Sequence, residues 1–156
     1  MSWDLLGWLT LHSPSALVKF EPDRLSEEKR IKVFKRIFTK YEDTSLYFYD
    51  EYCDERELAN FANSVEVINF LIEKINKPLN VPSQYNAINI LRHFQSLFGL
   101  NEQVKDCLLS CCKCYPETPK QVCRLCLLAF GDLKLYEFGN CYYYNAEAKN
   151  EENSLA

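Results

Sequence analysis

Cysteines are the residues of this chain whose types and spacing could most readily do chemistry. The chain has eight cysteines in 156 residues, and six of them lie within residues 107–126. Cys111 and Cys114 form one Cys-x-x-Cys pair, Cys123 and Cys126 form a second, and eight residues separate the two pairs. Structural zinc sites take four thiolate or imidazole ligands and often use two such pairs. One interpretation of these four residues is therefore a zinc site.

The same cysteines also suit the core of a helical pair. Cys107, Cys111 and Cys114 are spaced by four and then three residues, which places them on one face of a helix. Free cysteine is among the most buried residue types and behaves as a small hydrophobe. Leucines surround these positions, whereas zinc knuckles usually carry glycine and polar residues. We favour core packing with no cofactor over zinc, and we expect Cys112 to lie off the inward stripe.

Catalytic chemistry finds little support in the sequence. A reactive Cys-x-x-Cys needs a helix N-terminus, and Cys123 lies about four residues into its predicted helix. A nucleophilic cysteine needs a histidine partner, and the chain contains only His12 and His93. No Gly-rich phosphate loop and no metal-hydrolase motif is present. The sequence therefore predicts a protein that is not an enzyme.

Composition narrows the classes of partner and the location. The net charge is −4, which speaks against a general affinity for nucleic acid or anionic membranes. No apolar run is long enough to span a membrane, and the apolar stretch near the N-terminus lacks the basic residues of a signal peptide. These features favour a cytoplasmic or nuclear location, where thiols stay reduced.

A basic helix is the clearest element of the chain. Ser26 is a good N-cap for a helix that continues to Tyr41, with apolar residues at helical spacing. Its other face carries Lys29, Arg30, Lys32, Lys35, Arg36 and Lys40. Lys32, Lys35 and Arg36 are candidates for contact with phosphate groups. A solvated helix face is the interpretation that we favour.

The N-terminal segment, residues 1–21, carries two tryptophans. Trp3 and Trp8 could bind a partner, or they could dock this segment on the core as a short helix or an extended strand. Tied-down termini more often account for such residues. We therefore expect docking and keep partner binding as the alternative.

The remaining pattern predicts a mainly α fold, an irregular helical bundle or a short α-solenoid-like array of five or six helices. The predicted helical segments are 23–41, 55–75, 83–98, 101–115 and 118–130, and Asn63 and Ser64 could divide the second of them. Residues 45–49 could be a short strand or part of a helix. Residues 133–145 predict a β-hairpin, residues 1–145 a single domain, and residues 146–156 a disordered tail.

The predicted role is a non-enzymatic protein–protein interaction or adaptor protein that presents a helical surface to a protein partner. The alternative, from a different class, is a small zinc-stabilised regulatory module. In that alternative the four paired cysteines hold the metal, and residues 29–40 contact nucleic acid.

Overall fold

The computed structural model describes residues 8–9, 12–20 and 22–135. Within them it contains seven α-helices, one short 3₁₀ helix and no strand, so the prediction of a mainly α fold is confirmed. The elements are α2 Pro14–Phe20, η1 Pro22–Arg24, α3 Glu27–Asp43, α4 Glu55–Phe61, α5 Val65–Asn76, α6 Val81–Leu91, α7 Asn101–Lys113 and α8 Lys120–Asp132. The described residues contain one α-helix more than the five or six predicted, because α2 forms within the predicted docking segment.

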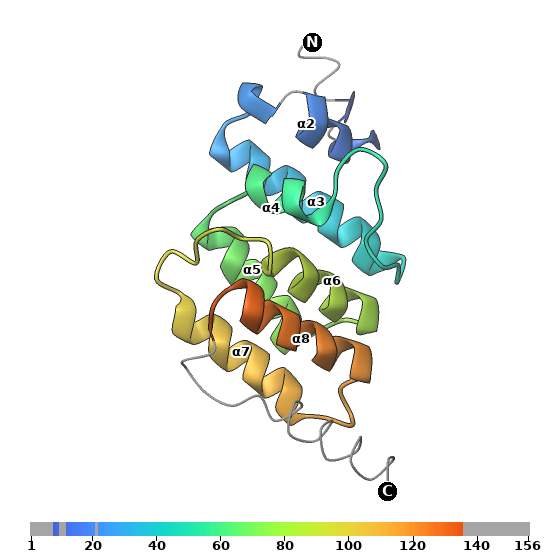
Figure 1. Ribbon diagram of the computed structural model, residues 1–156. Coiled ribbons are helices and arrows are strands. Elements are labelled where there is room, and N and C mark those ends of the chain that lie inside the picture. The colour runs from blue at the N-terminus through green and yellow to red at the C-terminus, as the bar shows by residue number, and fades with distance from the viewer. Residues whose placement is uncertain (1–7, 10–11, 21, 136–156) are drawn as a thin grey trace, which may run out of the picture.

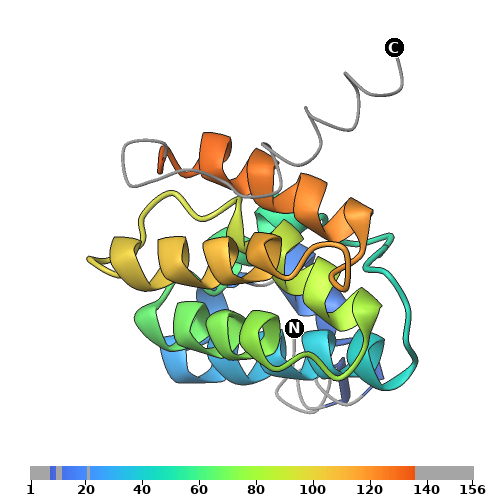
Figure 2. The same cartoon turned by 90° about the horizontal axis from the view of Figure 1, so that it is seen from below.

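The helices lie in successive layers (Figure 1). Helix α2 packs on α3 and α4 at one end, α3 and α4 pack on α6, and the α5–α6 layer packs on α7 and α8 at the other end. Figure 2 views the stack from the end formed by α7 and α8. Helix α6 lies in the middle, because it contacts α3, α4, α5 and α8. In the described part of the chain, no helix combines the length and the apolar character needed to cross a bilayer.

Side-chain caps explain where several helices begin. Ser26 Oγ accepts a hydrogen bond from the Lys29 N–H at 3.2 Å, so the predicted N-cap of α3 is confirmed. Ser64 Oγ accepts a hydrogen bond from the Val67 N–H at 3.2 Å and starts α5. This cap separates α4 from α5. The predicted segment 55–75, which Asn63 and Ser64 could divide, is therefore two helices.

Three other predicted segments begin with a residue suited to an N-cap, Ser83, Asn101 and Thr118, but none of the three is the N-cap residue in the structure. Asn80 Oδ1 accepts a hydrogen bond from the Ser83 N–H at 2.8 Å, so Ser83 lies in the first turn of α6 instead of capping it. Asn101 is the first residue of α7 instead of its N-cap. Thr118 precedes the N-cap position of α8, which Pro119 occupies. Several polar residues near each start made the exact cap hard to choose from the sequence.

Helix α6 ends at Leu91, whereas the sequence predicted a helix continuing to about Phe98. The prediction rested on apolar residues at helical spacing, including Phe94 and Leu97. Both side chains are buried, but from a non-helical segment that turns between α6 and α7. Apolar residues at helical spacing indicate which side chains are buried. Here a series of turns buries Phe94 and Leu97 without continuing the helix.

Two regions differ from the predicted alternatives. Residues 44–54 form neither a strand nor a helix. Leu133 and Lys134 form a turn after α8, so the first predicted hairpin strand does not begin at Leu133. The rest of the predicted hairpin and the predicted tail lie outside the described residues.

A buried carboxylate connects three helices in the core. Glu42, at the end of α3, is 5% exposed. Its Oε1 lies 2.9 Å from Lys74 Nζ of α5, and its Oε2 accepts a hydrogen bond from Ser83 Oγ of α6 at 2.6 Å. Because the charge has both an ionic partner and a hydroxyl donor, its burial is compensated.

Candidate functional site

Helices α7 and α8 pack together (Figure 1), and the clustered cysteines lie on these two helices. Cys107, Cys111 and Cys112 of α7 and Cys123 and Cys126 of α8 are all buried. The expectation that Cys112 lies off the inward face is wrong, since only 1% of it is exposed. Helix α7 packs on α5 as well as on α8, so a residue off one buried stripe is covered by a second neighbour.

Burial and contact with neighbouring cysteines raise the pKa of three of these thiols. Burial, followed by the nearby Cys111, raises the pKa of Cys107 to about 12. Burial, followed by the neighbouring cysteines of α7, raises the pKa of Cys123 to about 12. Hydrogen bonds with Cys111 and Cys112, together with burial, raise the pKa of Cys126 well above its ordinary value. A raised pKa opposes formation of the thiolate that nucleophilic or redox chemistry needs.

The four predicted zinc ligands do not share one environment. Cys111, Cys123 and Cys126 are buried, whereas Cys114 is exposed at the C-cap of α7. Among the residues that the structure describes, no three side chains of Cys, His, Asp or Glu are arranged to hold a metal ion. Zinc binding stays a prediction that only a measurement of metal content can test.

The predicted basic face lies on α3 and is partly neutralised. Lys32 Nζ lies 3.6 Å from Glu28 Oε1 on the same helix. Lys35 Nζ lies 3.4 Å from Glu66 Oε1 of α5 and 5.5 Å from the ring centroid of Phe70. These contacts are those of a solvated helix face that packs along its neighbour.

Lys35 and Arg36 also line a surface cavity of about 540 Å³ together with His12. The ring of Trp8 lies on His12, with 4.7 Å between the ring centroids, and Trp8 is 52% exposed. The structure thus brings together candidate residues from the N-terminal segment and from α3. Trp3 lies outside the described residues.

Residues 44–54, between α3 and α4, are clamped onto α6 by a single buried side chain. Asn86 Oδ1 accepts a hydrogen bond from the Phe48 N–H at 2.8 Å, and Asn86 Nδ2 donates to the Leu46 carbonyl at 2.9 Å. Tyr41 adds a third tie, because its hydroxyl donates to the Tyr49 carbonyl at 2.6 Å. The Phe48 ring fills the core beneath the loop, 4.9 Å from the ring of Tyr41.

The clamp leaves large apolar side chains facing outward. Leu46, Tyr47 and Tyr49 are 55%, 45% and 86% exposed. Tyr47 stacks edge-on against Tyr85, with ring centroids 5.1 Å apart, beside a shallow surface cavity of about 520 Å³. We call residues 46–49 together with Tyr85 the aromatic surface. The sequence showed the tyrosines of this segment but not that one asparagine holds them outward.

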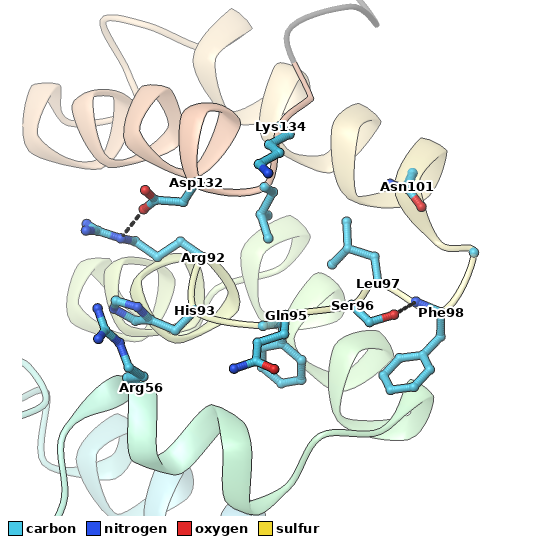
Figure 3. Close-up of a pocket in the computed structure, with 13 residues that line it drawn as sticks. Arg56, Arg92, His93, Gln95, Ser96, Leu97, Phe98, Asn101, Asp132 and Lys134 are labelled. Atoms are coloured by element: carbon cyan, nitrogen blue, oxygen red, sulfur yellow. Dashed lines mark hydrogen bonds and ion pairs between the residues drawn. The ribbon is translucent and has the colours of Figure 1, made fainter.

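A third, polar cavity of about 740 Å³ lies between α4, the turns that follow α6 and the end of α8 (Figure 3). Its charged lining residues are Arg56, Arg92, Asp132 and Lys134. Arg92 Nε lies 2.8 Å from Asp132 Oδ2, and because the N–H is not aligned with this oxygen the contact is an ion pair without a good hydrogen bond. We call this the cationic cavity.

Sequence reasoning missed the cationic cavity. Arg56 and Lys134 are far apart in the chain and belong to no motif, so only the packing of α8 over α6 brings them together. The sequence predicts that His93 is a surface or boundary residue of an amphipathic helix, and in the structure it lines this cavity just after α6 has ended. The one local signal was the adjacent pair Arg92 and His93 inside a predicted helix.

Comparisons with protein-family models, with curated proteins and with solved structures found no match. Any assignment of function therefore rests on the surfaces described above.

Proposed function

We propose that this chain is a non-enzymatic protein–protein interaction module that presents the aromatic surface to a basic segment of a protein partner. The observation that carries the proposal is the Asn86 clamp, which fixes the loop backbone while leaving Tyr47 and Tyr49 exposed. A loop that is ordered before binding loses little conformational entropy when the partner arrives. Tyrosine is enriched at the energetic centres of interfaces.

The charge of the loop supports a basic partner. Residues 44–54 contain Asp50, Glu51 and Asp54 and no lysine or arginine. Basic side chains of a partner would meet carboxylates here, and a guanidinium could lie over the exposed ring of Tyr49. An apolar side chain of the partner would find Leu46 and Tyr85 beside it. The matching ligand is a peptide with basic residues and at least one apolar anchor.

The state of the thiols supports the non-enzymatic part of the proposal. The raised pKa values of Cys107, Cys123 and Cys126 keep the buried sulfur atoms neutral at pH 7. Neutral thiols packed between two helices act as core residues. The layered helix pairs support the solenoid-like variant of the fold, in which exposed loops between layers are a usual place for partner contacts.

A peptide-display selection against the full chain tests the proposal. We expect basic peptides with an apolar residue to be enriched, and their affinity to fall as the salt concentration rises. Tyr49→Ala and Glu51→Lys should each lower the affinity for these peptides by about tenfold, since each removes one favourable contact. Leu128→Ala and Glu73→Lys change exposed residues elsewhere and should leave the affinity unchanged. Enrichment of acidic peptides, or equal binding by Tyr49→Ala, would refute the proposal.

The zinc-stabilised module is the alternative, and a different measurement separates it. Protein purified without chelator is assayed for zinc, and its unfolding is followed with and without chelator. One zinc per chain and loss of the fold on chelation would support the alternative. Unchanged stability without bound metal would support the interaction module.

A further inference from the structure

The described lining of the cationic cavity carries more positive than negative charge. Its walls hold three cations, Arg56, Arg92 and Lys134, and one carboxylate, Asp132. Asp132 pairs with Arg92. Within the described part of the chain, the side chains of Arg56 and Lys134 make no ion pair and no hydrogen bond. Figure 3 shows Arg56 beside His93 on one wall and Lys134 on the opposite side.

The pKa of His93 depends on burial and on the charges around the cavity. Burial lowers the pKa of His93, and Arg92 and Arg56 lower it further, while Glu55 and Asp132 act in the opposite direction. Glu55 Oε1 accepts a hydrogen bond from Asn89 Nδ2 at 3.0 Å, and because the amide is neutral Glu55 keeps its charge. The imidazole therefore faces Arg92 on its own segment and both Arg56 and Glu55 on α4.

Lys134 stands where the backbone favours glycine. Helix α8 ends in a Schellman motif: the Leu135 N–H donates to the Phe130 carbonyl at 2.9 Å, and the Lys134 N–H donates to the Gly131 carbonyl at 3.2 Å. In this motif the residue at Lys134 adopts a left-handed conformation, and its φ is 56°. Glycine adopts this conformation without strain, whereas lysine does so at a cost.

Helix α3 ends in the same motif and provides a comparison. Ser45 holds the corresponding position with a φ of 54°, and its Oγ accepts a hydrogen bond from Asn80 Nδ2 at 3.2 Å. The side chain of Ser45 thus has a structural partner that accounts for a non-glycine residue. The ammonium group of Lys134 has none among the described residues, and it projects into the cavity (Figure 3).

We propose that the cationic cavity binds a phosphate monoester. Its lining side chains carry three positive charges and one negative, which matches the charge of about −1.5 to −2 that a phosphate ester has at pH 7. Arginine forms paired hydrogen bonds to phosphate oxygens, and Gln95 and Ser96 add neutral donors to the lining. The volume of about 740 Å³ exceeds a phosphate group, and Phe98 at the rim is 46% exposed, so room and an apolar contact remain for the group that carries the phosphate.

Nuclear magnetic resonance of the two histidines tests this proposal on the full chain. The Cε1–H signals of His93 and His12 are followed against pH with inorganic phosphate, a phosphoserine peptide and a nucleoside monophosphate, each against chloride at the same ionic strength. A bound dianion favours the imidazolium, so we expect the pKa of His93 to rise in a saturable manner. His12 lines the cavity on α3 and should not respond. The ester that binds more tightly than inorganic phosphate identifies the source of the phosphate group.

Substitutions separate binding from structure. Arg56→Gln should weaken the response of His93 by about tenfold, since one charge-assisted contact is lost. Lys134→Gly should weaken it similarly while raising the melting temperature, because glycine relieves the left-handed strain. Ser45→Gly, which also relieves strain but loses the Asn80 contact, should leave the response unchanged. Lys77→Gln removes an exposed lysine outside the cavity lining and should also have no effect.

The proposal would be overturned by three results. One is the absence of a saturable His93 response to any of the three phosphates at millimolar concentration. A second is a response of His12 alone, which would place the anion at α3. The third is an undiminished His93 response in both Arg56→Gln and Lys134→Gly.

Discussion

Asn86 of α6 fixes the position of Phe48: its side-chain oxygen accepts a hydrogen bond from the Phe48 N–H at 2.8 Å. Its amide nitrogen donates to the Leu46 carbonyl at 2.9 Å, so one side chain satisfies two backbone groups of the same loop. No strand lies beside these residues in the described part of the chain. An asparagine on a helix has taken the place of a neighbouring strand.

Asn86→Ala should therefore release the loop. Two backbone groups lose their partners, and we expect unfolding to become easier by about 2 kcal/mol in denaturant melts. Binding of the selected peptides should fall as well, since the tyrosines would no longer be held outward. Asn89→Ala, three residues further along α6, removes only a half-buried contact with Glu55 and should cost less than about 1 kcal/mol. Equal effects of the two substitutions would argue against the clamp.

The buried pair of Glu42 and Lys74 should matter far more than an exposed pair. Glu42→Ala leaves the Lys74 ammonium and the Ser83 hydroxyl without their acceptor, and we expect a loss of roughly 3 kcal/mol. Glu28→Ala breaks the exposed pair with Lys32 and should cost less than about 0.5 kcal/mol. Urea melts of the two variants side by side provide the comparison, and similar losses would contradict it.

The cysteine series should separate core packing from metal binding. In a core, Cys→Ser at Cys111, Cys112 or Cys126 buries a hydroxyl and costs about 1–3 kcal/mol, while Cys→Ala is milder. Cys114 is exposed and should tolerate both changes. With bound zinc, alanine would be as harmful as serine at Cys111, Cys114, Cys123 and Cys126, and Cys114 would then tolerate neither change. Denaturant melts of both series distinguish the two patterns.

Alkaline pH should destabilise the fold through three buried cysteine thiols. The pKa values of Cys53, Cys107 and Cys123 are raised to about 12 in the folded chain, from an ordinary value of 9.0. Below pH 9 the thiols are protonated in both states, so their contribution is fully present there. Between about pH 9 and 12 the unfolded chain loses protons that the folded chain keeps, and stability falls. Replacing Cys107 with alanine should flatten this fall in melts recorded across that range.

The basic face of α3 should contribute little to stability. Changing Lys32, Lys35 and Arg36 together to Gln removes partly exposed charges, and we expect the free energy of unfolding to change by less than about 1 kcal/mol. Mobility shifts with single- and double-stranded nucleic acid at low salt should be the same for this variant and for the wild-type chain. Binding that the variant loses, and that the wild-type chain loses at high salt, would instead indicate phosphate contact by α3.

Helical periodicity accounts for most of what could be predicted from the sequence. The apolar stripe and the serine cap of α3 were evident, because both signals lie within a few residues of each other. The loop at residues 44–54 was not, since its aromatic composition suits a strand and its backbone partner, Asn86, lies on another helix. Cys112 was misplaced because a stripe shows one buried face and cannot show that α7 has two covering neighbours.

The candidate surfaces were less predictable than the helices. Lys35 and Arg36 could be proposed from their spacing, yet their approach to His12 depends on how the N-terminal segment packs on α3. Arg56 and Lys134 come to line one cavity only through the layered packing, and no local sequence pattern indicates this. A single sequence does not show which residues that are far apart in the chain lie close together in the fold.

The central position of α6 has a consequence for the order in which the molecule opens. Because α6 contacts α3, α4, α5 and α8, separating either end layer leaves its backbone amides covered. Native-state hydrogen exchange should therefore find the slowest amides in α6, exchanging only with global unfolding, while α2 exchanges earlier through local fraying. The loop clamped by Asn86 is attached to this slowest unit, so the exposed tyrosines stand on the part of the molecule that opens last.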